Sequence, residues 1–319
     1  MNCEQLLASY RREMAKRIVG QKNMVDSLLM ALIAGGHVLL EGVPGLAKTL
    51  AVKSLAEITG LSFKRIQFTP DLLPADLTGT LIWEPAHAAG GGSFSVRKGP
   101  VFANVILADE INRSPAKVQS ALLEAMEERQ VTIGEETHQL PDPFFVLATE
   151  NPIDFEGTYQ LPEAELDRFL IKLSLSYPNG DEELAIVAAS PALSARAGST
   201  ESLRPVLDRE ALASFRFSAD DVKIDEKMLQ YIVSIVAATR QYKYISFGAS
   251  PRASIALSRL ARIKASFEGR DFVGPGDIKA LAPMVLRHRL VLSYEAEAEG
   301  INADGVISRI LAHVPIPLR

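Results

Sequence analysis

The chain has little of several residue types, and each shortage removes a class of protein. A single cysteine, Cys3, occurs among 319 residues, so neither an internal disulfide nor a zinc-type cysteine pair is possible. No stretch approaches the roughly 18 apolar residues of a membrane helix, and the charged N-terminal segment lacks an apolar signal core. We therefore expect a protein of the reducing cytoplasm that does not insert into a membrane.

Histidine is also scarce, and acidic residues outnumber basic ones. The five histidines are scattered without the spacing of metal ligands, so they predict no metal site: His37, His87, His138, His288 and His313. The net charge is −5, which does not indicate a basic groove for nucleic acid, and we expect no nucleic-acid partner. With 47% hydrophobic and 23% charged residues, the composition is that of an ordinary globular protein.

Short apolar runs alternate with helical patterns over the first 180 residues or so. This order predicts an α/β fold with a parallel sheet flanked by helices. The expected strands are 36–42, 63–69, 104–110, 144–151 and 169–177. Beyond a turn-rich stretch at 190–205, which is typical of a linker, the patterns are helical. We predict a nucleotide-binding core over 1–190 and a smaller, all-α domain over 191–319.

Two stretches of the first domain do not follow the alternation of strand and helix. Residues 80–100 contain two strand-like halves around a Gly-Gly-Gly tip, and residues 130–143 contain two around Gly134. Both predict β-hairpins inserted beside the core. They are either variable surface loops or contact surfaces for a neighbouring subunit or a client protein.

The segment GVPGLAKT, residues 42–49, has the composition of a phosphate-binding loop. It follows an expected strand and opens an expected helix, and its glycines allow the tight bend that turns N–H groups toward an anion. Lys48 can reach the β- and γ-phosphates, and Thr49 can ligate Mg²⁺. Ala47 stands where glycine is usual, which we expect to be tolerated if its backbone is already helical.

Polar residues also end two of the expected strands. Asp109 and Glu110 follow one apolar run, where ligands bind in α/β sheets, so Asp109 can hold Mg²⁺ through water and Glu110 can activate a water molecule. Thr149, Glu150 and Asn151 end the next strand. The amide of Asn151 can contact a γ-phosphate or the attacking water.

Two arginines occupy unusual positions. Arg252 lies in the first turn of a helix that Ser250 is expected to cap, where a positive charge is disfavoured unless an anion is near. Arg168 directly precedes an expected strand. It either pairs with Asp167 in its own subunit or projects toward a neighbour's phosphate.

With these motifs in view, the chain resembles the MoxR family of AAA+ ATPases. Alanine commonly replaces the last glycine of the phosphate loop in that family, as at Ala47. The resemblance spans the chain from about residue 10 onward, through RIVGQ (17–21), LADEINRSP (107–115), ATENP (148–152), LPEAELDRF (161–169) and GASPRA (248–253).

The resemblance implies roles for individual residues. Asp109 and Glu110 would form Walker B, with Glu110 the catalytic base. Asn151 would be sensor 1, Arg168 an arginine finger acting in trans, and Arg252 sensor 2, reaching the γ-phosphate from a helical lid. The residues implied to contact ATP are Val19, Gly20 and Gln21 at the adenine, and Gly42, Val43, Pro44, Gly45, Leu46, Ala47, Lys48 and Thr49 of Walker A. Thr49 and Asp109 would hold Mg²⁺.

The resemblance also implies an assembly and a task. Members are thought to form rings, usually hexamers, and to remodel partner proteins, commonly ones with von Willebrand factor A domains. It implies ATP and Mg²⁺ as ligands. Three alternatives share the motifs: a nucleotide-dependent binding switch with slow turnover, a chelatase-type motor subunit, and a DNA-translocating ATPase, which the acidic balance disfavours.

Overall fold

A computed structural model of the chain describes residues 3–42, 47–85, 92–150, 158–175, 177, 180–188 and 203–317. The expected linker at 190–205 and the predicted domain boundary at residue 190 lie almost wholly outside these ranges. The boundary therefore stays a prediction.

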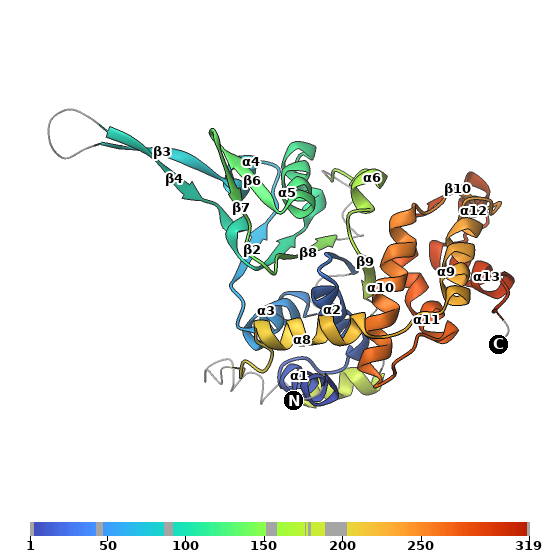
Figure 1. Cartoon of the computed structure of the whole chain (residues 1–319). Helices are drawn as coiled ribbons and strands as arrows, with labels where there is room; N and C mark the ends of the chain where they lie inside the picture. Colours follow the sequence, from blue (N-terminus) through green and yellow to red (C-terminus); the bar gives the residue numbers. More distant parts are fainter. Residues whose placement is uncertain are drawn as a thin grey trace.

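A five-stranded parallel sheet forms the centre of the N-terminal half (Figure 1). Its order is β2-β5-β8-β1-β9. The strands are β1 (Val38–Gly42), β2 (Phe63–Gln67), β5 (Val105–Asp109), β8 (Phe145–Glu150) and β9 (Ile171–Leu175). All five strands predicted from the apolar runs are present, and the parallel sheet is confirmed. Every carboxyl end therefore lies at one edge, the carboxyl edge, and every amino end at the other, the amino edge.

Helices cover both faces of this sheet. Successive strand residues point to opposite faces, so Leu40 and Leu147 join one apolar cluster while Leu39 and Ala148 join the other. The first cluster includes α1 (Cys3–Ala15), α2 (Lys22–Ala34) and α3 (Lys48–Thr59). The second includes α4 (Pro74–Thr78), α5 (Ala116–Glu128) and the 3₁₀ turns η1 (Pro100–Phe102) and η2 (Ile111–Arg113).

Two antiparallel hairpins occupy the segments that interrupt the alternation. One is β3 (Gly79–Pro85) with β4 (Gly92–Lys98), and the other is β6 (Gln130–Ile133) with β7 (Glu136–Gln139). The β3–β4 hairpin projects from the body as an arm (Figure 1). Trp83 and Phe94 face each other across it with ring centroids 5.0 Å apart, and both are more than half exposed. Residues 86–91 of its tip lie outside the described part.

The C-terminal region is mainly helical. Its helices are α8 (Arg209–Asp220), α9 (Glu226–Thr239), α10 (Pro251–Phe267), α11 (Pro275–Leu286), α12 (Tyr294–Ala298) and α13 (Ala303–His313). The all-α expectation misses one detail, a two-stranded antiparallel sheet of β10 (Ile245–Phe247) and β11 (Val291–Leu292). Two short helices lie before this region, α6 (Glu163–Leu166) and one over 180–188.

The C-terminal helices do not have a core of their own. Leu257 of α10 and Leu281 of α11 belong to the same buried cluster as Leu28 of α2. Two residues that follow α11 contact the segment that precedes β9. Arg289 Nε donates to Asp167 Oδ1 over 2.7 Å, and His288 Nε2 lies 3.0 Å from the Phe169 carbonyl. The helical region is thereby fixed against the amino edge of the sheet.

Candidate active site

Strands β5 and β8 bring two acidic residues and a hydroxyl together at the carboxyl edge. Thr149 Oγ1 donates to Asp109 Oδ1 over 2.7 Å and accepts from the Glu110 backbone N–H over 2.9 Å. Thr149 itself is buried. One threonine thus fixes both the carboxylate of Asp109 and the direction in which the chain leaves β5.

Glu110 has a left-handed backbone, with φ 57° and ψ 51°. This region is unfavourable for a residue with a side chain, and such conformations concentrate at functional sites. The carboxylate is only partly buried: Oε2 accepts from Gln67 Nε2 over 2.9 Å and lies 3.3 Å from Arg113 Nε. Glu110 is therefore held at the open edge of the sheet and can contact a ligand there.

Asp109 has a basic partner on the neighbouring strand. Arg65 of β2 donates to Asp109 Oδ2 from Nη2 over 2.6 Å and from Nε over 3.0 Å. Thr149 occupies the other carboxylate oxygen, so Asp109 is oriented from both sides. The register of the sheet explains the pairing, because Gln67 lies beside Asp109 and Arg65 lies beside Leu107. Arg65 is therefore one side-chain repeat away from Asp109 on the same face of the sheet.

Lys48 is the first residue of α3 and lies near this cluster. Partial burial lowers the pKa of its amino group, and the negative charges of Asp109, Glu110 and Glu41 oppose the shift. Lys48 Nζ donates to the Gly42 carbonyl at the end of β1. Lysine and the two carboxylates are thus neighbours at the carboxyl edge. Val43, Pro44, Gly45 and Leu46 of the expected phosphate loop lie outside the described residues.

Ala47 does not have the backbone expected of it. The interpretation that it is already helical is wrong, because it precedes α3 as the N-cap with φ 54° and ψ 22°, which is left-handed. An L-residue in this region costs roughly 1–2 kcal/mol relative to the right-handed helix. The methyl group is therefore accommodated with backbone strain, at the position where the usual pattern has glycine.

The residues present fit a magnesium ion bound together with phosphate. Thr49 offers a hydroxyl and Asp109 a carboxylate, and such oxygen ligands suit Mg²⁺. Because Thr149 and Arg65 already bond the two carboxylate oxygens, Asp109 would hold the ion through water. Among the described residues, no group of three or more His, Cys, Asp and Glu side chains could hold a metal ion. An ion at this edge would therefore need phosphate oxygens or water to complete its coordination.

The turn between α1 and α2 contains the residues expected at the adenine. Gly20 and Gln21 both have left-handed backbones, with φ 69° and 51°, and Gln21 precedes α2. Val19 is partly buried. The Glu182 carboxylate lies alongside, since a Cβ placed on Gly20 would be 3.3 Å from its Oε1. No described feature assigns this turn to a base, so the adenine pocket stays a prediction.

Asn151, the expected sensor 1, lies outside the described residues. The residue before it is Glu150, the last of β8, and burial raises the pKa of Glu150 against the opposing charge of Lys172. Lys172 Nζ lies 3.7 Å from Glu150 Oε2 and 3.3 Å from Glu41 Oε1.

Arg168 and Arg252 lie together at the other end of the sheet. Both contact Glu127, near the end of α5: Arg168 Nε is 3.0 Å from Oε2, and Arg252 Nη2 is 2.6 Å from Oε1. Arg168 therefore does not pair with Asp167, which binds Arg289 and the Ser250 hydroxyl instead. Ser250 caps α10 as predicted, accepting from the Arg252 backbone N–H.

The expectation that Arg252 reaches the phosphate of its own subunit is wrong for this structure. The pocket that contains Arg252 is lined by Gly36 and His37, which precede β1, whereas Lys48 follows its far end. The five residues of β1 separate the end next to Gly36 and His37 from the end next to Lys48 by about 13 Å. Arg252 is therefore held near the amino edge, at the opposite end of β1 from Lys48.

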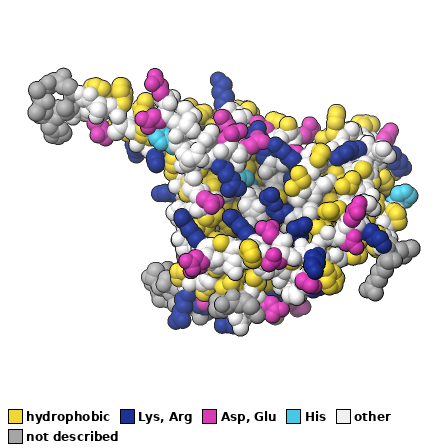
Figure 2. Space-filling view, in the orientation of Figure 1, with side chains coloured by type: hydrophobic (Ala, Val, Ile, Leu, Met, Phe, Trp, Pro, Cys, Tyr) yellow, Lys and Arg dark blue, Asp and Glu magenta, His cyan; other side chains and the backbone are white. Residues whose placement is uncertain are grey.

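The amino edge carries an excess of positive charge. A pocket of about 290 Å³ is lined by five arginines and only two carboxylates: Arg129, Arg168, Arg252, Arg259 and Arg289 against Glu127 and Asp167. Figure 2 shows basic side chains around the hollow in the middle of this face. The arrangement suits an anion supplied from outside the subunit.

Among the residues of these two clusters that had no role in the sequence analysis are Arg65, Glu127 and Thr149. Arg65 sits on an exposed strand and Glu127 within a charged helical stretch, so neither pattern distinguishes it from a solvated residue. Thr149 did carry a signal, because it lies at the end of an apolar strand within the motif that contains Asn151.

Comparisons with known proteins agree with this architecture. A family model described as the ATPase family associated with various cellular activities (AAA) matches residues 37–171. A second model, the AAA lid domain, matches residues 237–310. A crystal structure of a protein from Cytophaga hutchinsonii has 47% sequence identity and a TM-score of 0.88, covering 99% of this chain and 96% of that one.

Curated relatives match over nearly the full length. Uncharacterized protein YeaC of Bacillus subtilis is 47% identical over 302 residues, 95% of this chain and 92% of the relative. Chaperone MoxR1 of Mycobacterium tuberculosis is 46% identical over 314 residues, 96% of this chain and 81% of the relative. Protein MoxR of Methylorubrum extorquens is 31% identical over 332 residues, 97% of this chain and 95% of the relative.

Proposed function

Because the chain belongs to the MoxR family of AAA+ ATPases, we propose that it uses ATP hydrolysis to remodel or activate partner proteins. The observation that supports this most is the carboxyl edge, where Lys48 faces Asp109 and Glu110 and Thr149 fixes both acidic residues. We propose ATP and Mg²⁺ as its ligands and the cytoplasm as its location. No helix of the described part could cross a bilayer.

Glu110 is the base of the proposed reaction. Its carboxylate is partly exposed and oriented by Gln67, so it can accept a proton from water that attacks the γ-phosphate in line. Lys48 binds the β- and γ-phosphates, and Asn151 contacts the γ-phosphate or the water. Bound through Thr49 and Asp109, Mg²⁺ would neutralise charge on the phosphate oxygens.

Arg168 and Arg252 act on the ATP of a neighbouring subunit. Each lies at the amino edge and cannot serve its own carboxyl edge, so head-to-tail contact is the arrangement that supplies them to a phosphate. Repeated head-to-tail contacts close into a ring when the rotation permits, and we propose a hexamer. Arginine fingers contribute about 10³–10⁵ in rate in related reactions, so an isolated subunit should hydrolyse ATP slowly.

The hairpins are the proposed contact with clients. The β3–β4 arm exposes Trp83 and Phe94 away from the body, and aromatic side chains are enriched at protein interfaces. Proteins with von Willebrand factor A domains are the partners we propose first. ATP-dependent capture of such a protein by a Glu110→Gln ring, lost on Trp83→Ser, would support this; equal capture without ATP would contradict it.

The decisive experiment mixes two inactive variants. Glu110→Gln should bind ATP and assemble without turnover, and Arg168→Ala should assemble poorly and turn over slowly. A mixed ring contains sites with an intact Glu110 and a neighbour's intact Arg168, so activity should reappear at intermediate ratios. Arg12→Ala, at an exposed position of α1, is the matched control and should keep full activity. No recovery at any ratio would contradict action in trans, and full turnover by Glu110→Gln would contradict its role as base.

A further inference from the structure

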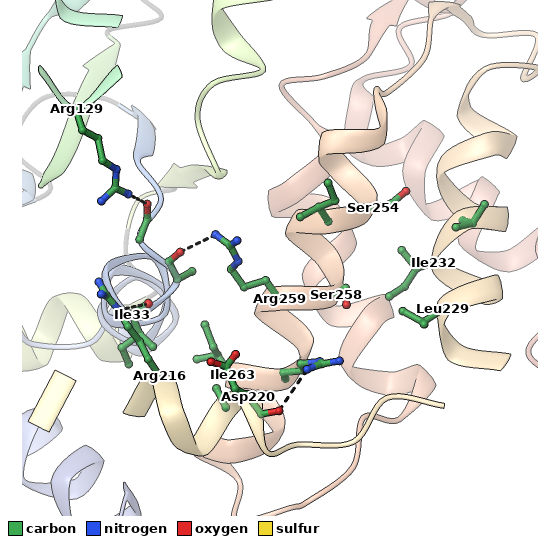
Figure 3. A pocket seen from close by; sticks show the side chains of 16 residues that line it. Ile33, Arg129, Arg216, Asp220, Leu229, Ile232, Ser254, Ser258, Arg259 and Ile263 are labelled. Atoms are coloured by element: carbon green, nitrogen blue, oxygen red, sulfur yellow. Dashed lines mark hydrogen bonds between the residues drawn. The ribbon is translucent and has the colours of Figure 1, made fainter. Parts of the chain in front are cut away.

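A second groove continues from the arginine pocket along α10 (Figure 3). Its volume is about 640 Å³, and it lies between the end of α2 and helices α8, α9 and α10. Apolar side chains on its wall are exposed: Leu229 by 40%, Val233 by 56% and Ile255 by 61%. A cluster of exposed aliphatic side chains in a concave site is typical of a protein interface.

The edge of this groove is basic. Arg216 Nε donates to the Ile33 carbonyl over 2.9 Å, Arg259 Nη1 to the Ala34 carbonyl over 3.0 Å, and Arg262 Nη1 to the Asp220 carbonyl over 3.4 Å. These partners are neutral backbone groups. No ion pair joins the three guanidinium groups to a carboxylate within the described ranges, so the groove is suited to an acidic, partly apolar partner.

The helix over 180–188 has this chemistry. None of its residues is buried, although Leu184 and Val187 are apolar and exposed by 69% and 63%. Its first turns carry three acidic residues, Asp181, Glu182 and Glu183. In the single subunit, its apolar side chains are therefore left in solvent.

This helix lies at the nucleotide end of the subunit. It follows β9, whose Leu175 is in register with Gly42 at the start of the phosphate loop. Glu182 lies against Gly20, in the turn expected at the adenine. Helix 180–188 is thus placed beside the part of the site farthest from the γ-phosphate.

Helix α10 connects the groove to the proposed trans contact. Arg252, Ile255, Arg259 and Arg262 are spaced by three, four and three residues, so they share one face of the helix. With a rise of 1.5 Å per residue, Arg259 and Arg262 lie about 10 and 15 Å along the axis from Arg252. If Arg252 meets the neighbour's γ-phosphate, the basic edge of the groove lies about 10–15 Å from that phosphate.

We propose that helix 180–188 of one copy of this chain docks into the groove between α2, α8, α9 and α10 of the next copy. Leu184 and Val187 cover the apolar wall, and Asp181 and Glu183 of the acidic turn meet Arg216, Arg259 and Arg262. The contact rests on the proposed head-to-tail ring and extends its interface beyond the phosphate. In each subunit, helix 180–188 would then both border the adenine end of the nucleotide site and bind the adjacent subunit.

Cross-linking tests this contact directly. In a Cys3→Ser background, a chain carrying both Leu184→Cys and Val233→Cys should form covalent dimers and a ladder of larger products with a short bis-maleimide and ATP. Both positions are exposed in the single subunit, so neither substitution should disturb folding. The matched control pairs Leu184→Cys with Tyr294→Cys, which is 84% exposed on α12 and outside the groove, and should give no ladder.

A complementation experiment tests the same contact independently of cross-linking. Val187→Asp and Ile255→Asp should each raise the protein concentration for half-maximal assembly by at least tenfold, while binding of a fluorescent ATP analogue stays within twofold. In a mixture, the intact helix of the Ile255→Asp chain can dock into the intact groove of the Val187→Asp chain. The other helix and groove of that pair are altered, so dimers should form and rings should not. Assembly with ATP but without cross-linking, or unimpaired assembly of both variants, would overturn the docking alone. A chain that binds ATP but never assembles would overturn the proposed ring as well.

Discussion

At the scale of the residue, Thr149 is the side chain on which the geometry of the carboxyl edge depends. It donates to Asp109 and accepts from the Glu110 N–H, and no other described side chain contacts both. Thr149→Val keeps the volume but leaves that N–H without its partner, which costs about 1–3 kcal/mol. We expect ATP turnover to fall at least tenfold with little change in KM.

Thr149→Ser is the matched control, because it keeps the hydroxyl and removes one methyl group. It should recover most of the turnover that Thr149→Val loses. Steady-state ATPase assays of both variants, with urea unfolding to measure stability, make the comparison. Equal turnover in the Val and Ser variants would show that the hydroxyl does not position the acidic residues.

His37 makes the fold sensitive to mild acid. It is buried and directly precedes β1. Its Nδ1 accepts from the Val146 N–H over 3.1 Å, and its Nε2 lies 3.3 Å from the Met126 carbonyl. Burial lowers the pKa of His37 from its ordinary 6.5 to about 4. The unfolded chain therefore binds a proton between these values that the folded chain does not, so stability is full above pH 6.5 and falls as pH decreases.

The predicted contribution of His37 is a loss of about 2 kcal/mol in the free energy of unfolding between pH 6.5 and 5. In His37→Gln, an amide can form both hydrogen bonds without titrating, so the variant should lose about 2 kcal/mol less than the wild type over this range. Urea unfolding at both pH values measures it. His288, whose pKa is also lowered by burial, titrates in both proteins and cancels from the difference. Parallel losses would contradict the assignment.

Much of the site could be predicted at this scale, because its signals are local. Lys48, Asp109 and Glu110 each end a strand or open a helix within a few residues of sequence, and parallel strands bring such ends together. Arg252 could not be placed in the same way. Its capped helix was correctly predicted, but which edge of the sheet that helix approaches depends on the packing of α10 against α2, and no short stretch of sequence encodes that contact.

At the scale of the element, the end of α5 contacts both arginines that we propose to act in trans. Glu127 binds Arg168 and Arg252 at once and is about one-third exposed. Its charge competes with an incoming phosphate for the same guanidinium groups. Glu127→Gln should therefore lower the protein concentration for half-maximal ATPase activity several-fold, while the exposed pairs contribute less than about 1 kcal/mol to stability.

Glu128→Gln is the control for this prediction, since it makes the same change of charge one residue later on an exposed position. It should leave the concentration dependence within twofold of the wild type. Activity measured across a dilution series of each protein separates the two variants. Equal behaviour of Glu127→Gln and Glu128→Gln would mean that the carboxylate does not compete with phosphate.

The elements themselves followed from the sequence to different degrees. Continuous apolar runs predicted all five sheet strands, because a strand buried on both faces has no polar alternation to obscure it. Strands β10 and β11 were missed, since runs of three and two residues leave no periodic signal. Both insert hairpins were predicted from glycine between alternating halves, but the projection of the β3–β4 arm depends on tertiary contacts around its base.

At the scale of the whole molecule, the predicted division into two domains is the least evident feature. The C-terminal helices share the buried cluster of α1 and α2, and Arg289 ties the chain after α11 to Asp167. A composition shift indicates a change of secondary structure and cannot reveal whether two segments bury a common surface. The sheet and the helical region are therefore joined through α2, whose buried residues belong to the same cluster as both.

The two edges of the sheet differ in charge, so the subunit is electrostatically polar from one edge to the other. At the carboxyl edge, Asp109, Glu110 and Glu150 are balanced by Arg65, Arg113 and Lys172, whereas the amino edge has five arginines against two carboxylates. Loading a triphosphate makes only the balanced edge negative. In the proposed ring, unloaded subunits would have little electrostatic preference for one orientation and loaded ones would attract in a single orientation, so the nucleotide itself would set the polarity in which copies join.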